Sequence, residues 1–457
     1  MARKYLKYIP IFIILLVGSM SLFWTNTHFL LSIGDYVFPQ ERLKEFFKML
    51  NVWDSTILGV PTFMITLGLP IPYGIYLVIT SILTISPIQS QAMWSYFLFI
   101  SLGLSMYFLV TQLMNTSAKY AAGLLSALFF MFSPWGAINI IMFVPYVTFI
   151  PFILGLYIKG LRENKGIRYI TFISIIWFFI SSFSLWNIRG FVFQWMMLIF
   201  YLIIFCLHNR NRVLKAVVFT FILFILYALL NCYWLLPFIL NISKSITASS
   251  DVYSVINYTK LDSFKVNSST MSYVLRLLDN WSLTANFKGT IYYAWLTFYL
   301  YPLPIIIGFL PIVAVLSSML FIMRGKIKAR SEIIFFFFLL LFGFFISMGK
   351  NNILIMWCAV NLPLFTSLFS SPSTHGGIFV VIGYAVLIGY SFMFVCKYIK
   401  NTRIQLGVFF LCVVIIVIYG YPVWSGKFIP LGNKMLGAGR YEIPSYVSNM
   451  ALNINKD

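Results

Sequence analysis

The sequence has 457 residues, of which 61% are of the apolar types AVILMFWYC and only 9% are charged, and its formal net charge is +21. A soluble chain is about 45–50% apolar and about 25% charged, so these values exclude a soluble globular protein, a disordered chain and a disulfide-stapled secreted domain. No charged residue lies between Asp54 and Lys119 or between Lys350 and Lys397. Because roughly 20 apolar residues cross a bilayer as a helix, the chain is predicted to be an all-α polytopic membrane protein.

The predicted elements begin with a first span near residues 9–24, which leads into a first external loop at 25–69. A long polar external loop covers 240–300, and a short polar tail covers 422–457. We expect residues 1–421 to form one transmembrane domain, with the tail outside it. The remaining predicted spans are apolar stretches at 70–86, 92–112, 119–133, 137–158, 169–185, 191–207, 216–239, 301–323, 332–348, 376–396 and 404–421.

Clusters of Lys and Arg set the predicted topology, because short basic loops stay in the cytoplasm. This use of the positive charge gives no reason to expect a nucleic-acid partner. With the N-terminus inside, the basic loop at 159–168 must also be inside, so an odd number of crossings lies between the first loop and that loop. The predicted spans between these two loops are four: 70–86, 92–112, 119–133 and 137–158. Either one stretch is not a full crossing or a fifth lies near 56–69, and 119–158 crosses once or twice. The prediction is 11–13 transmembrane helices in the cell membrane, with the C-terminus external.

The first external loop carries a helical pattern of its own. Leu43, Phe46, Phe47, Leu50 and Trp53 recur at helical spacing. The opposite face is filled by charged residues, namely Glu41, Arg42, Lys44, Glu45 and Lys48. This pattern predicts an amphipathic helix that lies in the membrane interface with its apolar side towards the lipid.

Asp35 stands just before this predicted helix, some ten residues after the first span, and four of the eleven acidic residues lie in this loop. A carboxylate held at the external membrane face is placed to act as a general base that takes a proton from an acceptor hydroxyl. The alternative is that Asp35 caps the interfacial helix or begins a turn. Residue type alone does not decide between these interpretations.

Several short phrases of the sequence, in this order, resemble the GT-C superfamily of lipid-linked-sugar glycosyltransferases, in particular its arabinofuranosyltransferase-like and YfhO-like members. The likeness covers roughly residues 9–446. The phrases are Gly34-Asp35-Tyr36-Val37-Phe38-Pro39, Ser133-Pro134-Trp135, Asn231-Cys232-Tyr233-Trp234-Leu235-Leu236-Pro237, and Leu362-Pro363-Leu364-Phe365 with Ser371-Pro372 after it.

The resemblance implies an inverting glycosyltransferase that moves a sugar from a polyprenyl-phosphate donor to a glycan, lipid or protein acceptor on the external face. Asp35 matches the position of the catalytic carboxylate in this superfamily. Relatives often carry Phe-Arg-x-Pro in the late external loop, where this chain has Phe369-Ser370-Ser371-Pro372 and lacks the arginine. Relatives also often continue into an external soluble domain, so the chain is a minimal member, a split member or a fragment.

A phosphate leaving group needs a cation, and few external cations are available in this sequence. The candidates for binding the phosphate are Arg189, His375, Lys350 and Arg440. For each of them the alternative is an interface anchor whose charged end reaches the headgroups. Asp54 together with Asp35 would suit a divalent cation, but the expectation is that no metal or other cofactor is needed. Residues 352–371 are predicted to form a re-entrant or interfacial element, or an ordinary membrane-surface helix.

Two other classes of function stay open. One is a carrier of a neutral substrate or a lipid, although such carriers usually place ionisable residues or broken helices within their spans. The other is a non-catalytic scaffold of a cell-surface glycan assembly pathway, which would explain the missing arginine. Asp35 discriminates among the glycosyltransferase, the carrier and the scaffold, because only the glycosyltransferase requires it.

Overall fold

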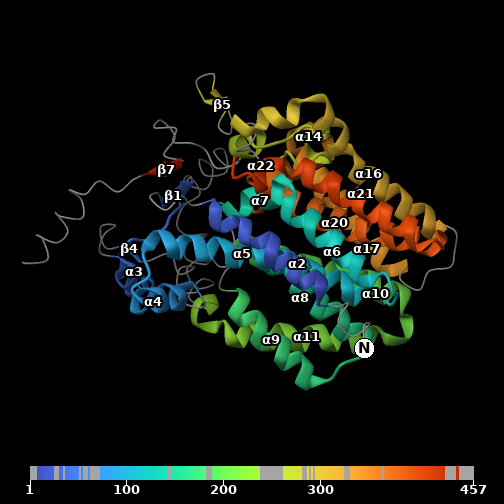
Figure 1. Cartoon of the computed structure of the whole chain (residues 1–457). Coiled ribbons are helices and arrows are strands. Elements are labelled where there is room, and N and C mark those ends of the chain that lie inside the picture. Colours follow the sequence, from blue (N-terminus) through green and yellow to red (C-terminus); the bar gives the residue numbers. More distant parts are fainter. Residues whose placement is uncertain are drawn as a thin grey trace, which may run out of the picture.

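The computed structural model gives the arrangement of most of the chain (Figure 1). Helices dominate it, and the few strands are short. The residues that it describes are 8–24, 30–33, 36–50, 53–54, 60–61, 73–141, 146–181, 188–236, 261–279, 286–287, 290–291, 294–323, 330–362, 365–427 and 439–441.

Seven described helices are long and apolar enough to cross a membrane. They are α5 (Pro87–Leu113), α10 (Ile188–His208), α11 (Val213–Leu230), α16 (Pro302–Met323), α17 (Arg330–Met348), α20 (Pro372–Tyr398) and α21 (Thr402–Tyr419). Shorter apolar helices accompany them: α2 (Ile9–Gly18) with the 3₁₀ helix η1 (Ser19–Phe23), α6 (Lys119–Phe132) and α9 (Ile167–Ser181). Helix α8 (Tyr146–Arg162) packs beside α5. The prediction of a multi-pass helical membrane protein is confirmed.

Contacts between helix termini define one end of the bundle, here called the basic end. Arg162, at the end of α8, donates from Nη1 to the Gln112 carbonyl at the end of α5 over 3.1 Å. Its Nε lies 3.5 Å from the Glu332 carboxylate at the start of α17. A small cleft beside them is lined by Lys165, Arg212 and Lys215. Basic residues of the loops at 159–168 and 210–215 therefore lie together at this end.

The opposite end, here called the loop end, carries the longer connections. It holds the 3₁₀ helices η6 (Ala294–Leu300) and η7 (Gly349–Asn351) and the short helices α14 (Met271–Leu275), α18 (Ile353–Asn361), α19 (Phe365–Leu368) and α22 (Tyr421–Trp424). The predicted number of 11–13 crossings stays a prediction, since seven of the described helices are long and apolar enough to cross a membrane.

Two places where the predicted topology was open contain described helices. Helix α4 (Ile75–Ile82) lies within the stretch at 70–86, and residues 119–158 contain α6 and α8 as separate helices. How often these stretches cross the membrane stays a prediction. The break falls at Ser133, which ends α6 and whose Oγ accepts from the Gly136 backbone N–H as α7 (Pro134–Ile141) begins.

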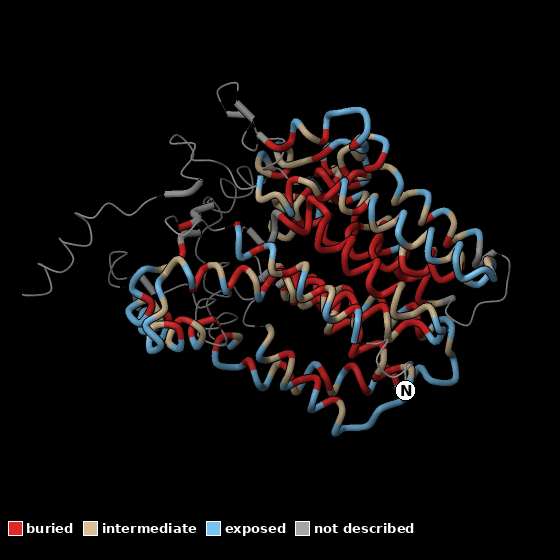
Figure 2. Tube along the Cα trace, viewed as in Figure 1, coloured by how far each residue is buried: buried red, intermediate tan, exposed pale blue. Residues whose placement is uncertain are grey.

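The core centres on α17 and α20, which pack closely along their length, and buried residues concentrate there (Figure 2). Glycines allow the close approach. A Cβ added to Gly343 would stand 2.6 Å from the carbonyl oxygen of Gly376 on the facing helix. Small residues at such a crossing are the usual way for membrane helices to bring their backbones together.

Short strands occur only near the loop end within the described residues. Strand β1 (Leu30–Ile33) pairs antiparallel with β2 (Tyr36–Val37) on one side and with β7 (Gly439–Tyr441) on the other. Two further pairs are isolated: β3 (Trp53–Asp54) with β4 (Val60–Pro61), and β5 (Asn286–Phe287) with β6 (Thr290–Ile291).

Helix α3 (Arg42–Leu50) occurs where the interfacial helix was predicted. Leu43, Phe47 and Leu50 are 41%, 60% and 49% exposed, as expected for a face that meets lipid rather than protein. One assignment was wrong. Arg42 was placed on the open polar face, but it is buried and donates to Ser90 Oγ and to the Ile85 carbonyl. These two hydrogen bonds hold α3 against the start of α5.

Candidate active site at the loop end

The strand register brings the tail of the chain to the first external loop. Ile33 pairs with Tyr36 across the β1–β2 hairpin, and the two residues between them in sequence, Gly34 and Asp35, lie outside the described residues. On the other edge of β1, Leu31 pairs with Arg440. The backbone of Arg440 is therefore joined to the strand that immediately precedes Asp35, although the two residues are about 400 positions apart. The catalytic role of Asp35 stays a prediction.

This three-stranded sheet is anchored on the bundle. Trp24, just before β1, is buried and donates from Nε1 to the Val423 carbonyl over 3.1 Å. Its ring packs 4.9 Å from that of Phe99 on α5. Leu30 and Phe38, which flank the hairpin, are fully buried. The segment that leads into β1 is thus fixed by contacts with α5 and with α22.

Arg189 and His375 come together on the same side of the loop end. Arg189 opens α10 and donates from Nε to the Ser367 carbonyl on α19 over 2.9 Å. His375, in the first turn of α20, is only 4% exposed, and its ring lies 5.4 Å from that of Phe193 on α10. Arg189 lies close enough to His375 for its positive charge to act on the imidazole ring. Two predicted phosphate-binding residues therefore share one region, but His375 faces protein rather than solvent.

Lys350 is placed differently. It lies in η7, is exposed, and is fixed through its backbone N–H, which donates to Ser268 Oγ over 2.9 Å. Its side chain stands on the surface whereas His375 is buried, and the role of Lys350 in binding phosphate stays a prediction.

The structure adds a buried polar cluster that sequence reasoning missed, which we name the loop-end cluster. It consists of Asp279 and Ser347, which lie together, and of Ser373 and His375 in the first turn of α20, which Ser347 faces through Gly376. The Ser347 hydroxyl would touch a Cβ on Gly376, the residue after His375, at 2.4 Å. Among the described residues, both Asp279 carboxylate oxygens, the hydroxyls of Ser347 and Ser373, and His375 Nδ1 lack a hydrogen-bond partner of good geometry. Such a concentration of unsatisfied polar atoms is unusual in a folded core and marks this cluster as a candidate site.

Burial raises the pKa of Asp279 to about 7, and the Ser347 hydroxyl beside it acts in the opposite direction. A carboxyl group with a pKa in this range can hold or release a proton near neutral pH, as groups at functional sites often do. Leu277, two residues earlier, has φ of 58° and is buried. A bulky residue in the left-handed region is strained, and such strain tends to persist where the surrounding structure enforces it.

Segment 261–279 holds Asp279 in place because it is tied to three helices. Tyr419 of α21 donates from its hydroxyl to the Arg276 carbonyl over 2.6 Å. Tyr384 of α20 donates to the Leu275 carbonyl, and Asn351 of η7 donates to the Ser269 carbonyl. The sequence predicted an external polar loop here, but this part of it closes the loop end of the bundle. The available signal was an acid, Asp279, that follows two leucines in a polar region.

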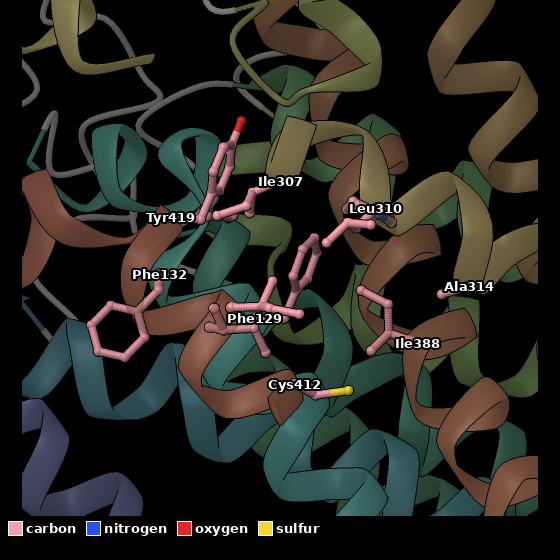
Figure 3. Close-up of a pocket in the computed structure, with 12 residues that line it drawn as sticks. Phe129, Phe132, Ile307, Leu310, Ala314, Ile388, Cys412 and Tyr419 are labelled. Atoms are coloured by element: carbon pink, nitrogen blue, oxygen red, sulfur yellow. The ribbon is translucent and has the colours of Figure 1, made fainter. Parts of the chain in front are cut away.

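An apolar groove runs down from the loop end between α6, α16, α20 and α21 (Figure 3). Its cavity has a volume of about 120 Å³. Tyr419 lies at one end of it and Cys412 nearer the middle of the bundle. The other lining residues include Phe129, Phe132, Ser133, Ile307, Leu310, Pro311, Ala314 and Ile388.

No group of three or more His, Cys, Asp or Glu residues that could hold a metal ion occurs in the described part of the chain. Asp54 is described, in β3, whereas Asp35 is not. The idea that these two carboxylates share a divalent cation therefore stays untested.

Comparison with known proteins supports the fold. The structure matches that of the arabinofuranosyltransferase AftD from Mycobacteria with a TM-score of 0.57 and 14% sequence identity. The match covers 100% of this chain and 29% of that chain. No protein-family model matches this sequence, and no curated protein matches it. The resemblance to GT-C membrane glycosyltransferases is thus confirmed at the level of the fold.

Proposed function

We propose that this chain is a membrane glycosyltransferase that moves a sugar from a polyprenyl-phosphate donor to a glycan, lipid or protein acceptor at the external face of the cell membrane. The observation that carries the proposal is the fold shared with an arabinofuranosyltransferase along the whole chain. The orientation follows from the positive-inside rule, which assigns the basic end to the cytoplasm and the loop end to the outside.

In the proposed reaction, the acceptor hydroxyl attacks the anomeric carbon of the sugar as the bond from that carbon to the phosphate oxygen breaks. Asp35 takes the proton of the hydroxyl as a general base, and the polyprenyl phosphate leaves with the bonding electrons. Attack from the face opposite the leaving group inverts the anomeric centre. Arg440, joined through its strand to β1, and Arg189 are the cations that we assign to the phosphate charge.

The test is replacement of Asp35 by Asn, with sugar transfer measured in membranes from polyprenyl-phosphate donors. The matched control is Glu41→Gln, which removes a carboxylate from the same loop, where Glu41 forms an exposed pair with Lys44. We expect Asp35→Asn to lower transfer by at least about 100-fold with normal membrane insertion, and the control to retain it. Normal transfer by Asp35→Asn would refute the assignment of the base. Absence of transfer by the unaltered protein with every donor would favour the carrier or the scaffold.

A further inference from the structure

The small cleft at the basic end lies where α8 and α10 end and α11 begins. Three basic residues line it, Lys165, Arg212 and Lys215, and Asn164 lines it with them. Among the described residues, no acidic side chain lines the cleft. Its volume of about 30 Å³ leaves room for a small polar group rather than for a whole organic molecule.

The end of α8 gives the cleft its shape. The backbone N–H of Lys165 donates to the Gly160 carbonyl over 3.0 Å, and that of Asn164 donates to the carbonyl of the residue after Gly160. These bonds close the helix. Asn164 has φ of 52°, a conformation that asparagine adopts more readily than most residues. A Cβ added to Gly160 would stand 2.5 Å from the Phe219 ring, so the end of α8 packs closely against the first turns of α11.

The cations of the cleft have donors to spare. Within the described part of the chain, no carboxylate pairs with Arg212 or Lys215. Arg212 donates from Nη1 to the Arg162 carbonyl over 3.2 Å, which leaves other N–H groups of its guanidinium for a ligand. Lys165 Nζ lies 2.9 Å from a Glu163 carboxylate oxygen, but both side chains are more than 40% exposed, and a pair of this kind contributes little. Three positive charges around one cleft repel one another, so an anion between them would be bound favourably.

The cleft also borders the surface that meets lipid. Leu207, near the end of α10, is 69% exposed, and Leu214 and Val218, in the first two turns of α11, are 77% and 45% exposed. In a chain that crosses the membrane, such side chains face the acyl chains, so the cleft beside them lies at the level of the headgroups. The positive-inside rule assigns this end to the cytoplasmic side, where basic pockets between helices bind acidic headgroups.

From these observations we infer that the cleft binds the phosphate of an acidic phospholipid in the leaflet at the basic end. Lys165, Arg212 and Lys215 supply the positive charge, and the Asn164 amide supplies an uncharged donor. A zwitterionic lipid fits less well, because its headgroup carries a cation that the three basic side chains repel. A lipid held there ties the basic end to its leaflet. It takes no part in sugar transfer, so this site is separate from the candidate active site.

The first test measures binding of phosphatidylglycerol to the full chain in micelles by native mass spectrometry. Arg212→Gln combined with Lys215→Gln removes two cations of the cleft. Arg168→Gln combined with Arg210→Gln is the matched control, because it removes the same charge from exposed residues that do not line the cleft. We expect the first variant to weaken binding by at least about tenfold and the control by less than about threefold. Equal weakening would show attraction to the surface charge in general and would overturn the site.

The second test keeps all three cations and adds a negative charge. Asn164→Asp places a carboxylate in the cleft, and aspartate tolerates the left-handed backbone there as asparagine does. Asn211→Asp adds the same charge to an exposed residue of the 3₁₀ helix η5 (Arg210–Arg212), which lies outside the lining of the cleft. We expect Asn164→Asp to weaken binding of phosphatidylglycerol by at least about tenfold and Asn211→Asp by less than about threefold. Unchanged binding by an Asn164→Asp variant that unfolds at the normal temperature would overturn the inference.

The last comparison identifies the source of the phosphate. The unaltered protein should bind phosphatidylglycerol at least about fivefold more tightly than phosphatidylcholine, and an excess of inorganic phosphate or glycerol phosphate should leave the lipid bound. Equal binding of the two lipids would overturn recognition of the headgroup charge. Displacement of phosphatidylglycerol by either soluble phosphate at an equal concentration would show a soluble compound as the ligand and would overturn the assignment to a lipid.

Discussion

The two ends of the bundle differ in how their polar groups are accommodated. At the basic end the connections are short and most charges stay near the surface. Glu332, a buried acid among the described residues there, is paired with Arg162. At the loop end, Asp279, Arg276 and His375 are buried, and each has a polar atom without a partner among the described residues.

This difference indicates that the loop end is the functional end of the bundle. The basic end needs only to fix topology, so its polar groups can be solvated or paired. Unsatisfied buried polar groups lower stability, and they are retained where a ligand or a proton completes them. Unsatisfied buried polar groups should therefore lower the folding stability at the loop end and not at the basic end.

The largest effect is expected at the basic end, from Arg162→Ala. The change leaves the buried Glu332 carboxylate without its cation, and breaking such a pair costs about 3 to 5 kcal/mol of unfolding free energy. Chemical denaturation in micelles measures it. Lys165→Ala breaks an exposed pair with Glu163 and should cost about 0.5 kcal/mol or less. If Glu332→Gln fails to rescue Arg162→Ala, the loss arises from packing and not from the stranded charge.

The next effect concerns Asp279 and depends on pH. Its pKa in the folded protein, about 7, lies above the value near 3.8 in the unfolded chain. The folded state therefore favours the protonated carboxyl, and its stability falls as the pH rises between these values and levels off above 7. Asp279→Asn removes this dependence. We expect the variant to gain about 3 kcal/mol relative to the unaltered protein between pH 5 and pH 8. Parallel stability profiles for the two proteins would contradict a buried, protonated Asp279.

Much of the fold was predictable because a bilayer restricts both the backbone conformation of a span and the side on which a loop lies. Apolar stretches of sufficient length must form helices that satisfy their own backbone, and basic loops sort to one side. Apolar composition does not reveal where a helix starts, and the stretch at 70–86 is an example. There the chain begins a new helix at Pro87, with a Ser86 capping box, so only the short α4 is left before it.

The candidate site was predicted less completely. Asp35 and Arg189 stood out because external charges are rare in this sequence. Asp279 did not stand out, because its burial results from the packing of distant segments, and its neighbour Ser347 lies some 70 residues later in the sequence. The pairing of Arg440 with Leu31 joins the two ends of the chain. Packing between distant segments has no local signal in a single sequence.

A smaller effect is expected where the two central helices meet near the loop end. Gly343→Ala places a Cβ 2.6 Å from the backbone oxygen of Gly376, and backbone cannot move aside as a flexible side chain does. We expect a loss of about 1 to 3 kcal/mol. Gly407→Ala, in α21 near the basic end, meets nothing within 4 Å and should instead add about 0.5 to 1 kcal/mol. Thermal unfolding of the two variants side by side measures the contrast, and equal melting temperatures would argue against the tight crossing.

The smallest effect compares two neighbours on α3, a helix that lies at the loop end. Arg42 is buried, its hydrogen bonds reach Ser90 and Ile85, and burial lowers its pKa. Arg42→Gln should cost about 1 to 2 kcal/mol, because two acceptors lose a charged donor. Lys44→Gln breaks an exposed pair with Glu41 and should cost less than about 0.5 kcal/mol. Protease cleavage within the first loop reports release of α3 and should rise only for Arg42→Gln. Equal cleavage of the two variants would mean that lipid, and not Arg42, holds this helix in place.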